Sequence, residues 1–241
     1  GATLVLQLAQ EGHGPLYDVF PFVKSVLSHP SILLAGVGID EDLIELYRWC
    51  DDDNDDDDQE NSLITVMEGE QQKPSARRLD IGGIGASTPG NTSGLKRLVH
   101  GVLGLELVKS KNLARSPWGR APLNKRQIDY AARDSWASVA ILHRLEQLDK
   151  GRFAPQALME LLIQEEERRK NQGIPVDIAK LSERANKRRI AKQKWRALKN
   201  KEEVWTAEER TEFENLFQVM QNLAPPPPLM FDVTSSLGIT I

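Results

Sequence analysis

The chain has 241 residues, of which 40% are apolar and 27% are charged, and this balance is typical of a globular protein with a buried core. No run of about 18 apolar residues occurs, and the first residues lack the pattern of a secretory signal. These features exclude a membrane-spanning protein and predict an intracellular one. The single cysteine, Cys50, excludes an internal disulfide and a zinc site built from several cysteines.

The net charge of −4 hides two blocks of opposite sign. Residues 51–60 contain eight acids and no base. Residues 168–201 contain thirteen lysines or arginines and two acids. The chain is therefore strongly polarised, and its two charged blocks need separate explanations.

Short apolar runs alternate with helical patterns at the start of the chain. Residues 3–9 and 15–20 are predicted to form a β-hairpin around a Gly-rich turn, and residues 19–30 a helix that ends at a proline. Residues 31–38 form an apolar run bounded by glycine, which is typical of a buried strand, and the acids at 40–42 begin the next helix. This alternation predicts an α/β fold.

The middle of the chain continues the pattern after an interruption. Residues 51–76 have too little apolar content to pack, so we expect a disordered acidic insertion. Residues 77–85 are consistent with a strand, and residues 124–148 with a long helix capped by Asn124. A helix over 93–107 has an apolar stripe of Leu95, Leu98, Val99 and Val102.

The last ninety residues differ in composition from the rest, because they are rich in charged residues and contain a run of prolines. Residues 154–173 and 174–205 are predicted to be two charged helices, the second started by Pro175 or Asp177, and 224–228 is a stiff proline-rich spacer. We therefore expect three parts: an α/β domain over 1–149, a charged helical extension over 150–223, and a proline-rich spacer and tail over 224–241.

Tyr130 and Asp134 are the first candidate site residues. Residues four apart on a helix share a face, so the hydroxyl and the carboxylate can reach one object together. Alone, the pair is weak, because a helical Asp is usually solvated and a helical Tyr usually packs. Small alanines on this helix predict a close neighbouring layer, and an ionised carboxylate held there requires a partner. The expected core-facing stripe is Ile128, Ala131, Ser135, Val139 and Leu142.

Asp42 is a second candidate, in the first turn of the helix that follows the buried strand. A structural explanation is also available, because acids near a helix N-terminus are stabilising by about 0.3–1 kcal/mol. That explanation covers Asp40, Glu41 and Asp42 equally and singles out none of them.

Two stretches taken together resemble the DEDDy-type 3′–5′ exonuclease domain of the RNase D and Werner-type exonuclease family. The segment AGVGIDED, residues 35–42, resembles the second motif of that family and places its metal-binding aspartate at Asp42. Residues 94–138 resemble the segment that runs into the third motif, Tyr-x-x-x-Asp, and place its residues at Tyr130 and Asp134. The resemblance covers about residues 3–148.

The resemblance implies a ribonuclease H-like mixed sheet flanked by helices and a two-metal phosphodiester hydrolysis. Family members hold two divalent ions, Mg²⁺ or Mn²⁺, with four carboxylates. Carried onto this sequence, Asp42 and Asp134 are metal ligands and Tyr130 orients the attacking water. The implied substrate is the 3′ end of DNA or RNA.

One departure from the family concerns its first motif, an Asp-x-Glu on a strand. That motif is expected upstream of residues 3–9, and this sequence lacks it together with the strand that carries it. We therefore expect the sequence to be a fragment of an active exonuclease. The alternative is a catalytically inactive nucleic-acid-binding or scaffold protein that retains the fold.

Basic residues near the third motif are candidates for phosphate contacts, with an ordinary exposed position as the alternative for each. Trp118 is expected to pack against the third-motif helix rather than stack on a base. The basic helix over 174–205 suits a nucleic-acid arm, a nuclear import signal or a solvated helix, and it favours the nucleus over the cytoplasm. The candidate phosphate contacts are Lys96, Lys109, Lys111, Arg115 and Arg120.

Overall fold

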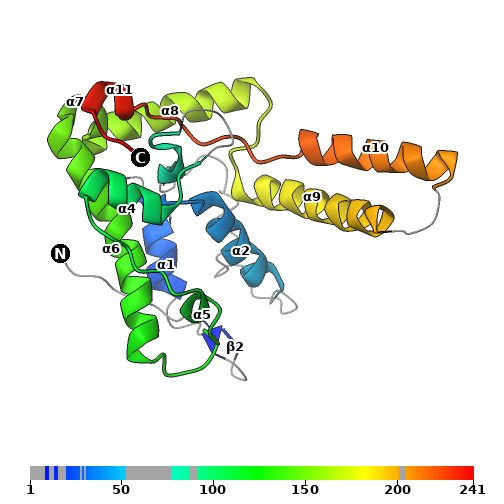
Figure 1. The fold of residues 1–241 in the computed structure, drawn as a ribbon, viewed down its shortest axis with the longest axis horizontal. Helices are drawn as coiled ribbons and strands as arrows, with labels where there is room; N and C mark the ends of the chain where they lie inside the picture. Colours follow the sequence, from blue (N-terminus) through cyan, green and yellow to red (C-terminus); the bar gives the residue numbers. More distant parts are fainter. Residues whose placement is uncertain are drawn as a thin grey trace.

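The computed structural model describes residues 9–10, 14–15, 20–27, 29, 31–52, 77–86, 92–200 and 205–241 (Figure 1). Within these ranges the chain is mostly helical, with four short strands. The elements in order are β1 Ala9–Gln10, β2 Gly14–Pro15, α1 Phe20–Leu27, β3 Leu33–Gly36, α2 Ile39–Asp52, β4 Arg77–Asp80, the 3₁₀ helix η3 Ile81–Gly83, α4 Leu95–Leu103, α5 Lys111–Ala114, α6 Lys125–Leu148, α7 Lys150–Phe153, α8 Pro155–Asn171, α9 Ile178–Lys199, α10 Ala207–Asn222 and α11 Thr234–Leu237.

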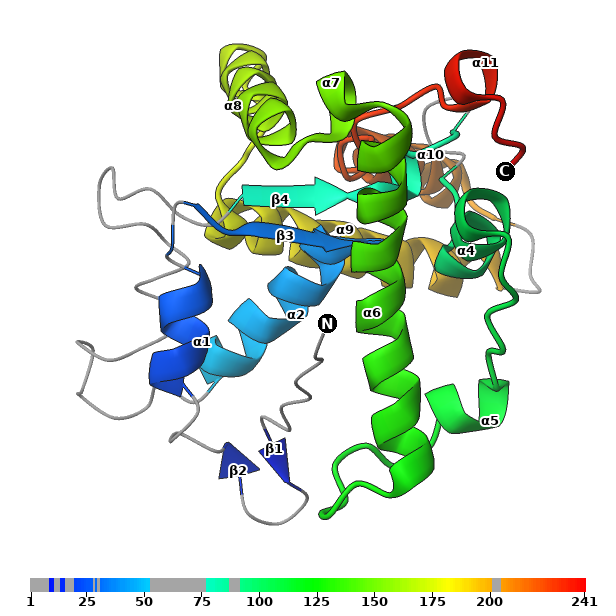
Figure 2. The ribbon, with the colours of Figure 1, turned by 90° about the vertical axis from the view of Figure 1, so that its left-hand side faces the viewer.

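Two strands at the centre of the molecule form a parallel sheet. β3 and β4 pair over four residues, with Leu33 opposite Arg77 and Gly36 opposite Asp80. Helix α2 contacts both strands, α8 contacts β4 and α6 contacts β3; Figure 2 shows the two strands side by side with α6 crossing one end. The expected α/β class is thus confirmed, and the ribonuclease H-like topology remains a prediction.

The flanking predictions are confirmed where the structure describes them. β1 and β2 pair as an antiparallel hairpin at the predicted turn, where Ala9 and Pro15 belong to the predicted strands; residues 3–8 and 16–19 of those strands lie outside the described residues. Helix α1 falls within the predicted helix 19–30. The expected acidic insertion begins later than predicted, because α2 continues through Asp52. The remainder of that prediction, residues 53–76, lies outside the described residues.

Helix α4 buries the stripe that its sequence predicts. Leu95, Leu98, Val99 and Val102 are all buried, and α4 packs against α6. The helix ends at Gly104, whose φ of 65° is the left-handed conformation that glycine adopts without a Cβ penalty. Its amide donates to the carbonyls of His100 and Val99 and so closes the last turn.

Helix α6 begins as predicted but buries a different face. Asn124 and Gln127 form a capping box at its start. The expected core-facing stripe is wrong for Ile128 and Val139, which are 43% and 54% exposed, and for exposed Ser135, whereas Leu142 does pack against the main core. The buried residues are Gln127, Ala137, Ser138, Ile141 and Leu145.

The packing of α4 gives the physical reason for this correction. α4 lies against α6, and the buried side of α6 carries Ala137, Ser138, Ile141 and Leu145, whereas Ile128 and Val139 lie on its exposed side. At 24 residues α6 is long, yet no helix in the described part of the chain is both long and apolar enough to cross a membrane.

The C-terminal tail is part of the main core. Phe231, Val233 and Ile239 are buried in the same cluster as β4, α4 and α6 residues. Phe231 and Ile84 form a parallel β-bridge, and the phenyl ring of Phe231 lies 5.4 Å from that of Phe153. The division of the chain into three parts therefore stays a prediction, to which the structure adds that the tail packs on the first part.

The close approach of this tail to the domain requires a glycine at position 83. A Cβ on Gly83 would lie 1.9 Å from the carbonyl oxygen of Leu229, a distance that no side chain can occupy. The backbone of the tail can therefore approach Gly83 directly, and the Phe231 amide donates to the Gly83 carbonyl at 3.1 Å.

Helices α9 and α10 lie side by side and extend away from the body of the protein (Figure 1). Asp177 caps α9, which settles the two predicted starts in its favour. Helix α10, which the sequence pattern did not lead us to predict as a separate element, begins with a capping box of Thr206 and Glu209. Rings of Trp195, Trp205 and Phe213 pack between the helices, with centroids 5.0 and 4.6 Å from Phe213.

Candidate active site

Asp42 lies just beyond the carboxyl end of β3. Gly38, with a φ of 73°, turns the chain from the strand into α2. Its carbonyl accepts hydrogen bonds from the amides of Glu41 at 2.9 Å and Asp42 at 3.4 Å. The turn therefore fixes the backbone of Asp42 at the start of α2.

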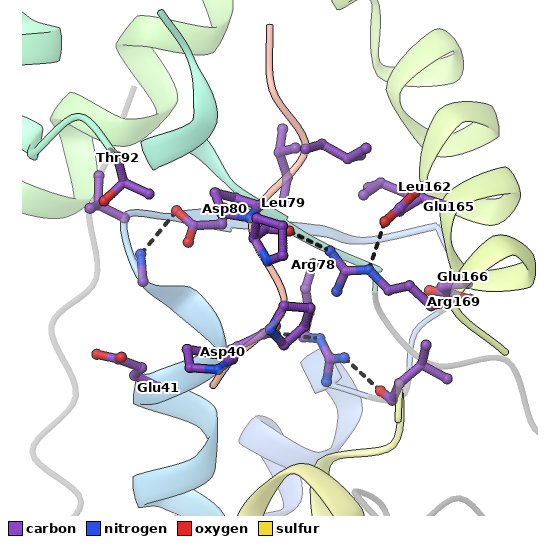
Figure 3. A pocket seen from close by; sticks show the side chains of 18 residues that line it. Asp40, Glu41, Arg78, Leu79, Asp80, Thr92, Leu162, Glu165, Glu166 and Arg169 are labelled. Atoms are coloured by element: carbon purple, nitrogen blue, oxygen red, sulfur yellow. Dashed lines mark hydrogen bonds and ion pairs between the residues drawn. The ribbon is translucent and has the colours of Figure 1, made fainter. Parts of the chain in front are cut away.

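Asp80 joins the ends of the two parallel strands. Its Oδ1 accepts a hydrogen bond from the Gly38 amide at 3.0 Å (Figure 3). It accepts another from the Gly82 amide at 2.8 Å. Our reading of the sequence did not single out this residue. The available signal was an aspartate directly after a strand that pairs in parallel with the strand before Asp42, since carboxyl ends of parallel strands meet at one edge.

Uncompensated negative charge gathers around Asp42. Partial burial, followed by the neighbouring carboxylates of Glu41 and Asp80, raises the pKa of Asp42 above its ordinary value. The ionised form of Asp42 is thus disfavoured in the folded protein. A bound cation would relieve this repulsion, and oxygen ligands are those that Mg²⁺ and Mn²⁺ prefer.

We expect Asp42→Asn to raise the stability of the folded protein at neutral pH. Because the pKa of Asp42 is raised on folding, its carboxyl favours the folded state most at low pH, and this contribution is lost as the pH rises through the folded pKa. The neutral amide removes that penalty. The gain in urea midpoint over the parent should be present at pH 7 without divalent ions and should shrink towards pH 4. Glu106→Gln, an exposed loop substitution with the same charge change, is the control, and an equal gain in both variants would contradict the local explanation.

Tyr130 and Asp134 lie in the N-terminal half of α6 and are both half-buried. The Tyr130 ring lies 5.9 Å from the ring of Trp118, whose Nε1 donates to the Ala114 carbonyl at 3.2 Å. Buried Gln127 holds the same loop by donating from Nε2 to Ser116 Oγ at 3.1 Å and to the Pro117 carbonyl at 3.3 Å. The expectation that Trp118 packs against the third-motif helix is confirmed.

Asp134 has a cationic partner. The Lys109 ammonium lies 3.2 Å from Asp134 Oδ2, and the two side chains are 35% and 30% exposed. The ammonium occupies a position where it neutralises the carboxylate. Lys109, expected as a phosphate contact, is therefore tied directly to the proposed catalytic aspartate.

The two predicted ligands have different immediate neighbours. Asp134 pairs with Lys109, whereas the carboxylates of Glu41 and Asp80 repel the ionised form of Asp42. Within the described residues no three or more His, Cys, Asp or Glu side chains come together as a metal site. The convergence of Asp42, Asp134 and Tyr130 on one cation therefore remains a prediction.

The remaining predicted phosphate contacts lie on two elements. Lys111 and Arg115 are exposed on α5 and at its end, close in sequence to Lys109, and Arg120 is exposed in the loop before α6. Lys96 is exposed on α4. The first three thus share the segment that carries Trp118 to the side of Tyr130, and Lys96 belongs to a separate helix.

A cavity of about 450 Å³ lies on another side of the first turn of α2 (Figure 3). Asp40 and Glu41 line it, whereas Asp42, Tyr130 and Asp134 do not. Pro225–Pro228 form part of its wall. Arg78 Nε lies 3.0 Å from Asp40 Oδ1 and Arg169 Nε 2.7 Å from Glu165 Oε1. These charges neutralise one another, and we interpret the cavity as a structural junction with the tail.

Comparison with known proteins decides the family. The sequence model of the 3′–5′ exonuclease family matches residues 2–148. The chain belongs to the 3′–5′ exonuclease family. A mouse protein, the bifunctional 3′–5′ exonuclease/ATP-dependent helicase WRN, is 32% identical over 132 residues, which make up 54% of this chain and 8% of the mouse protein. No solved structure matches the chain.

The exonuclease match contains every residue of the predicted catalytic set and ends at the last residue of α6. The Werner-type resemblance seen in the sequence is thereby confirmed. Helices α7 to α11 lie beyond the matched region, although the tail packs into the core of the exonuclease domain. The extension has to be explained from its own side chains.

Proposed function

We propose that the exonuclease domain hydrolyses the terminal phosphodiester bond at the 3′ end of a nucleic acid, with Asp42 and Asp134 as ligands of divalent ions. The observation that carries this proposal is the match of residues 2–148 to 3′–5′ exonucleases, which includes both aspartates. The raised pKa of Asp42 supports it: partial burial, and then the carboxylates of Glu41 and Asp80, disfavour the ionised carboxylate, and a cation would stabilise that form. We further propose that the domain has the ribonuclease H-like fold.

Each side chain has a separate role in this proposal. In a two-metal site the ions supply an activated water and stabilise the leaving 3′ oxygen. Asp42 and Asp134 hold carboxylate oxygens for them, while the Tyr130 hydroxyl orients the water through a hydrogen bond. The Trp118 ring beside Tyr130 limits the tilt of the phenol and so preserves its direction.

Lys109 has two uses in the proposed cycle. Its ammonium lies 3.2 Å from Asp134 Oδ2 and so neutralises that carboxylate. If Asp134 held a cation, the Lys109 ammonium would be free to contact a phosphate of the substrate. Lys96, Lys111, Arg115 and Arg120 are proposed to bind further phosphates by the same charge attraction.

The test is 3′ trimming by the protein translated from its full reading frame. Labelled DNA and RNA are incubated with that protein in Mg²⁺ or Mn²⁺ and, in parallel, in EDTA. Ladder-like shortening from the 3′ end that EDTA stops is the expected result. Metal-independent trimming, or binding without any trimming, would contradict the proposal, and the second outcome would favour an inactive nucleic-acid-binding or scaffold protein.

The proposed location is the nucleus, on the basis of the basic sequence of α9. Fluorescent fusions of the parent and of a chain with neutralised α9 lysines and arginines would show whether nuclear accumulation depends on that helix.

A further inference from the structure

One face of α9 changes character along its length. Its first half carries apolar residues at Ile178, Leu181 and Ala185, and Leu43 and Ile44 of α2 cover them. The same face continues at spacings of three and four residues, which keep side chains on one side of a helix. The continuation is entirely basic and exposed, and we call it the basic stripe: Arg189, Lys192, Arg196 and Lys199.

Other cations of α9 serve the fold. Arg184 donates to the Asn222 and Ala224 carbonyls, and Arg188 donates to the Met220 carbonyl at 3.3 Å, so both fasten α9 to the end of α10. Lys187 pairs with Glu183 one turn away. These residues have partners within the pair of helices α9 and α10, which we call the arm, and they explain part of the high Lys and Arg content of α9.

The basic stripe has no such use in the described part of the chain. None of its four members forms an ion pair with a described carboxylate; Arg189 donates only to the amide oxygen of Asn186 at 3.0 Å. The Lys199 ammonium lies 4.9 Å above the ring of Trp195, which itself stacks on Phe213. The arm is thus held by aromatic packing, and the charges of the basic stripe are available to an external anion.

The dimensions of the basic stripe suit a nucleic-acid backbone. At a rise of about 1.5 Å per residue, Arg189 to Lys199 cover about 15 Å, and each strand of duplex DNA carries a phosphate about every 3.4 Å along the helix axis. Leu181 packs in one cluster with Leu43, the residue next to Asp42. Measured along α9 at the same rise, the basic stripe begins about 12 Å beyond Leu181 and ends about 27 Å beyond Leu181. A strand whose 3′ end lies at Asp42 can therefore continue along this face.

We propose that the basic stripe of α9 binds the sugar-phosphate backbone of the substrate, about four nucleotides of it, at a distance from the bond that is cleaved. The proposal rests on the proposed function for the identity of the polymer. Arginine and lysine side chains contact phosphates without reading bases, so this interface adds affinity for long substrates and no sequence preference.

Neutralisation of all four stripe residues to Gln tests the proposal, with matched substitutions as the control. The control changes two other arginines and two other lysines to Gln, all exposed and outside the stripe: Arg144, Lys150, Lys170 and Arg210. Both variants lose the same charge, so a difference between them reports position. Binding of a fluorescent 20-nucleotide single strand is followed by anisotropy in EDTA at several salt concentrations.

For the stripe variant we expect at least about tenfold weaker binding at low salt. The slope of log affinity against log salt should become less steep by about 3, because each phosphate contact on a single strand contributes about 0.7. The control should keep a slope close to that of the parent. Equal losses in both variants, or parental affinity and slope in the stripe variant, would overturn the proposal and leave α9 as a solvated helix or an import signal.

A small substrate separates this inference from the proposed function. The p-nitrophenyl ester of thymidine 5′-phosphate is too short to reach from Asp42 to the basic stripe, so the full-length parent and the stripe variant should release p-nitrophenolate at equal rates in Mg²⁺. Slower release by the stripe variant would contradict a role in binding alone. If neither protein released p-nitrophenolate, the result would count against the nuclease proposal. The anisotropy experiment alone tests whether the basic stripe binds the nucleic-acid backbone.

Discussion

Asp134→Asn is expected to lower metal-dependent 3′ trimming more than about a hundredfold while substrate affinity in EDTA stays close to that of the parent. Mutation of residues that hydrogen-bond to metal ligands typically lowers metal affinity or activity by about 10–100-fold. Mutation of a direct ligand should lower activity by at least as much. Asparagine keeps the shape of the side chain but removes the charge that a divalent ion and Lys109 both require. The measurement is the initial rate of shortening of a labelled oligonucleotide by the full-length protein.

Asp129→Asn is the matched control for this experiment. Asp129 lies on the same helix, and it also pairs with a lysine, Lys125, at 2.9 Å. It is outside the proposed catalytic set, so its variant should trim at the parental rate. Parental activity in Asp134→Asn would remove Asp134 from the site, and equal losses in both variants would point to a general effect on α6 instead.

Phe231→Ala is expected to destabilise the protein by about 3–5 kcal/mol, the usual cost of removing a buried phenyl ring. The side chain is 6% exposed and lies against Phe153, while the Phe231 backbone exchanges hydrogen bonds with Gly83 and Gly85. Loss of the ring leaves a cavity between the tail and the exonuclease domain. Urea denaturation followed by circular dichroism measures the change.

Phe217→Ala makes the same chemical change at a position that is 48% exposed on α10. Its cost should be below about 1 kcal/mol, because much less apolar surface is removed from contact. If the two variants unfold at the same urea concentration, the tail does not stabilise the domain. If Phe231→Ala alone unfolds early, the last residues of the chain belong to the folding unit of the exonuclease domain.

Much of the helical structure could be predicted from local patterns. Asn124 and Asp177 cap α6 and α9 as expected, because a side-chain oxygen at that position accepts a helix amide whatever the rest of the fold does. The stripe of α4 was also correct. These features depend on residues a few positions apart, and those are what a sequence displays directly.

Predictions that depend on a distant partner succeeded less well. The larger apolar side chains of α6 were expected inside, yet Ile128 and Val139 are exposed and Ala137 is fully buried. The position of α4, set by the whole domain, decides which side of α6 is covered. Asp80 was missed for a similar reason, since its importance comes from pairing with the turn at Gly38, forty-two residues away.

The candidate site shows the same division. Asp42, Tyr130 and Asp134 could be selected because two motifs in the correct order resemble those of one enzyme family, and the family is confirmed. The ion pair between Lys109 and Asp134 and the charge around Asp42 could not be selected, because both arise between separate elements.

By itself the sequence determined the exonuclease family, the main helices and the opposite charges of its two blocks, because motifs, caps and charge counts are properties of neighbouring residues. Only the tertiary structure decided that the tail completes the core, that Asp80 joins the two strand ends, and that four cations of α9 lie together on an exposed face. These outcomes depend on which surfaces bury each other, and burial is settled by the packing of the whole chain.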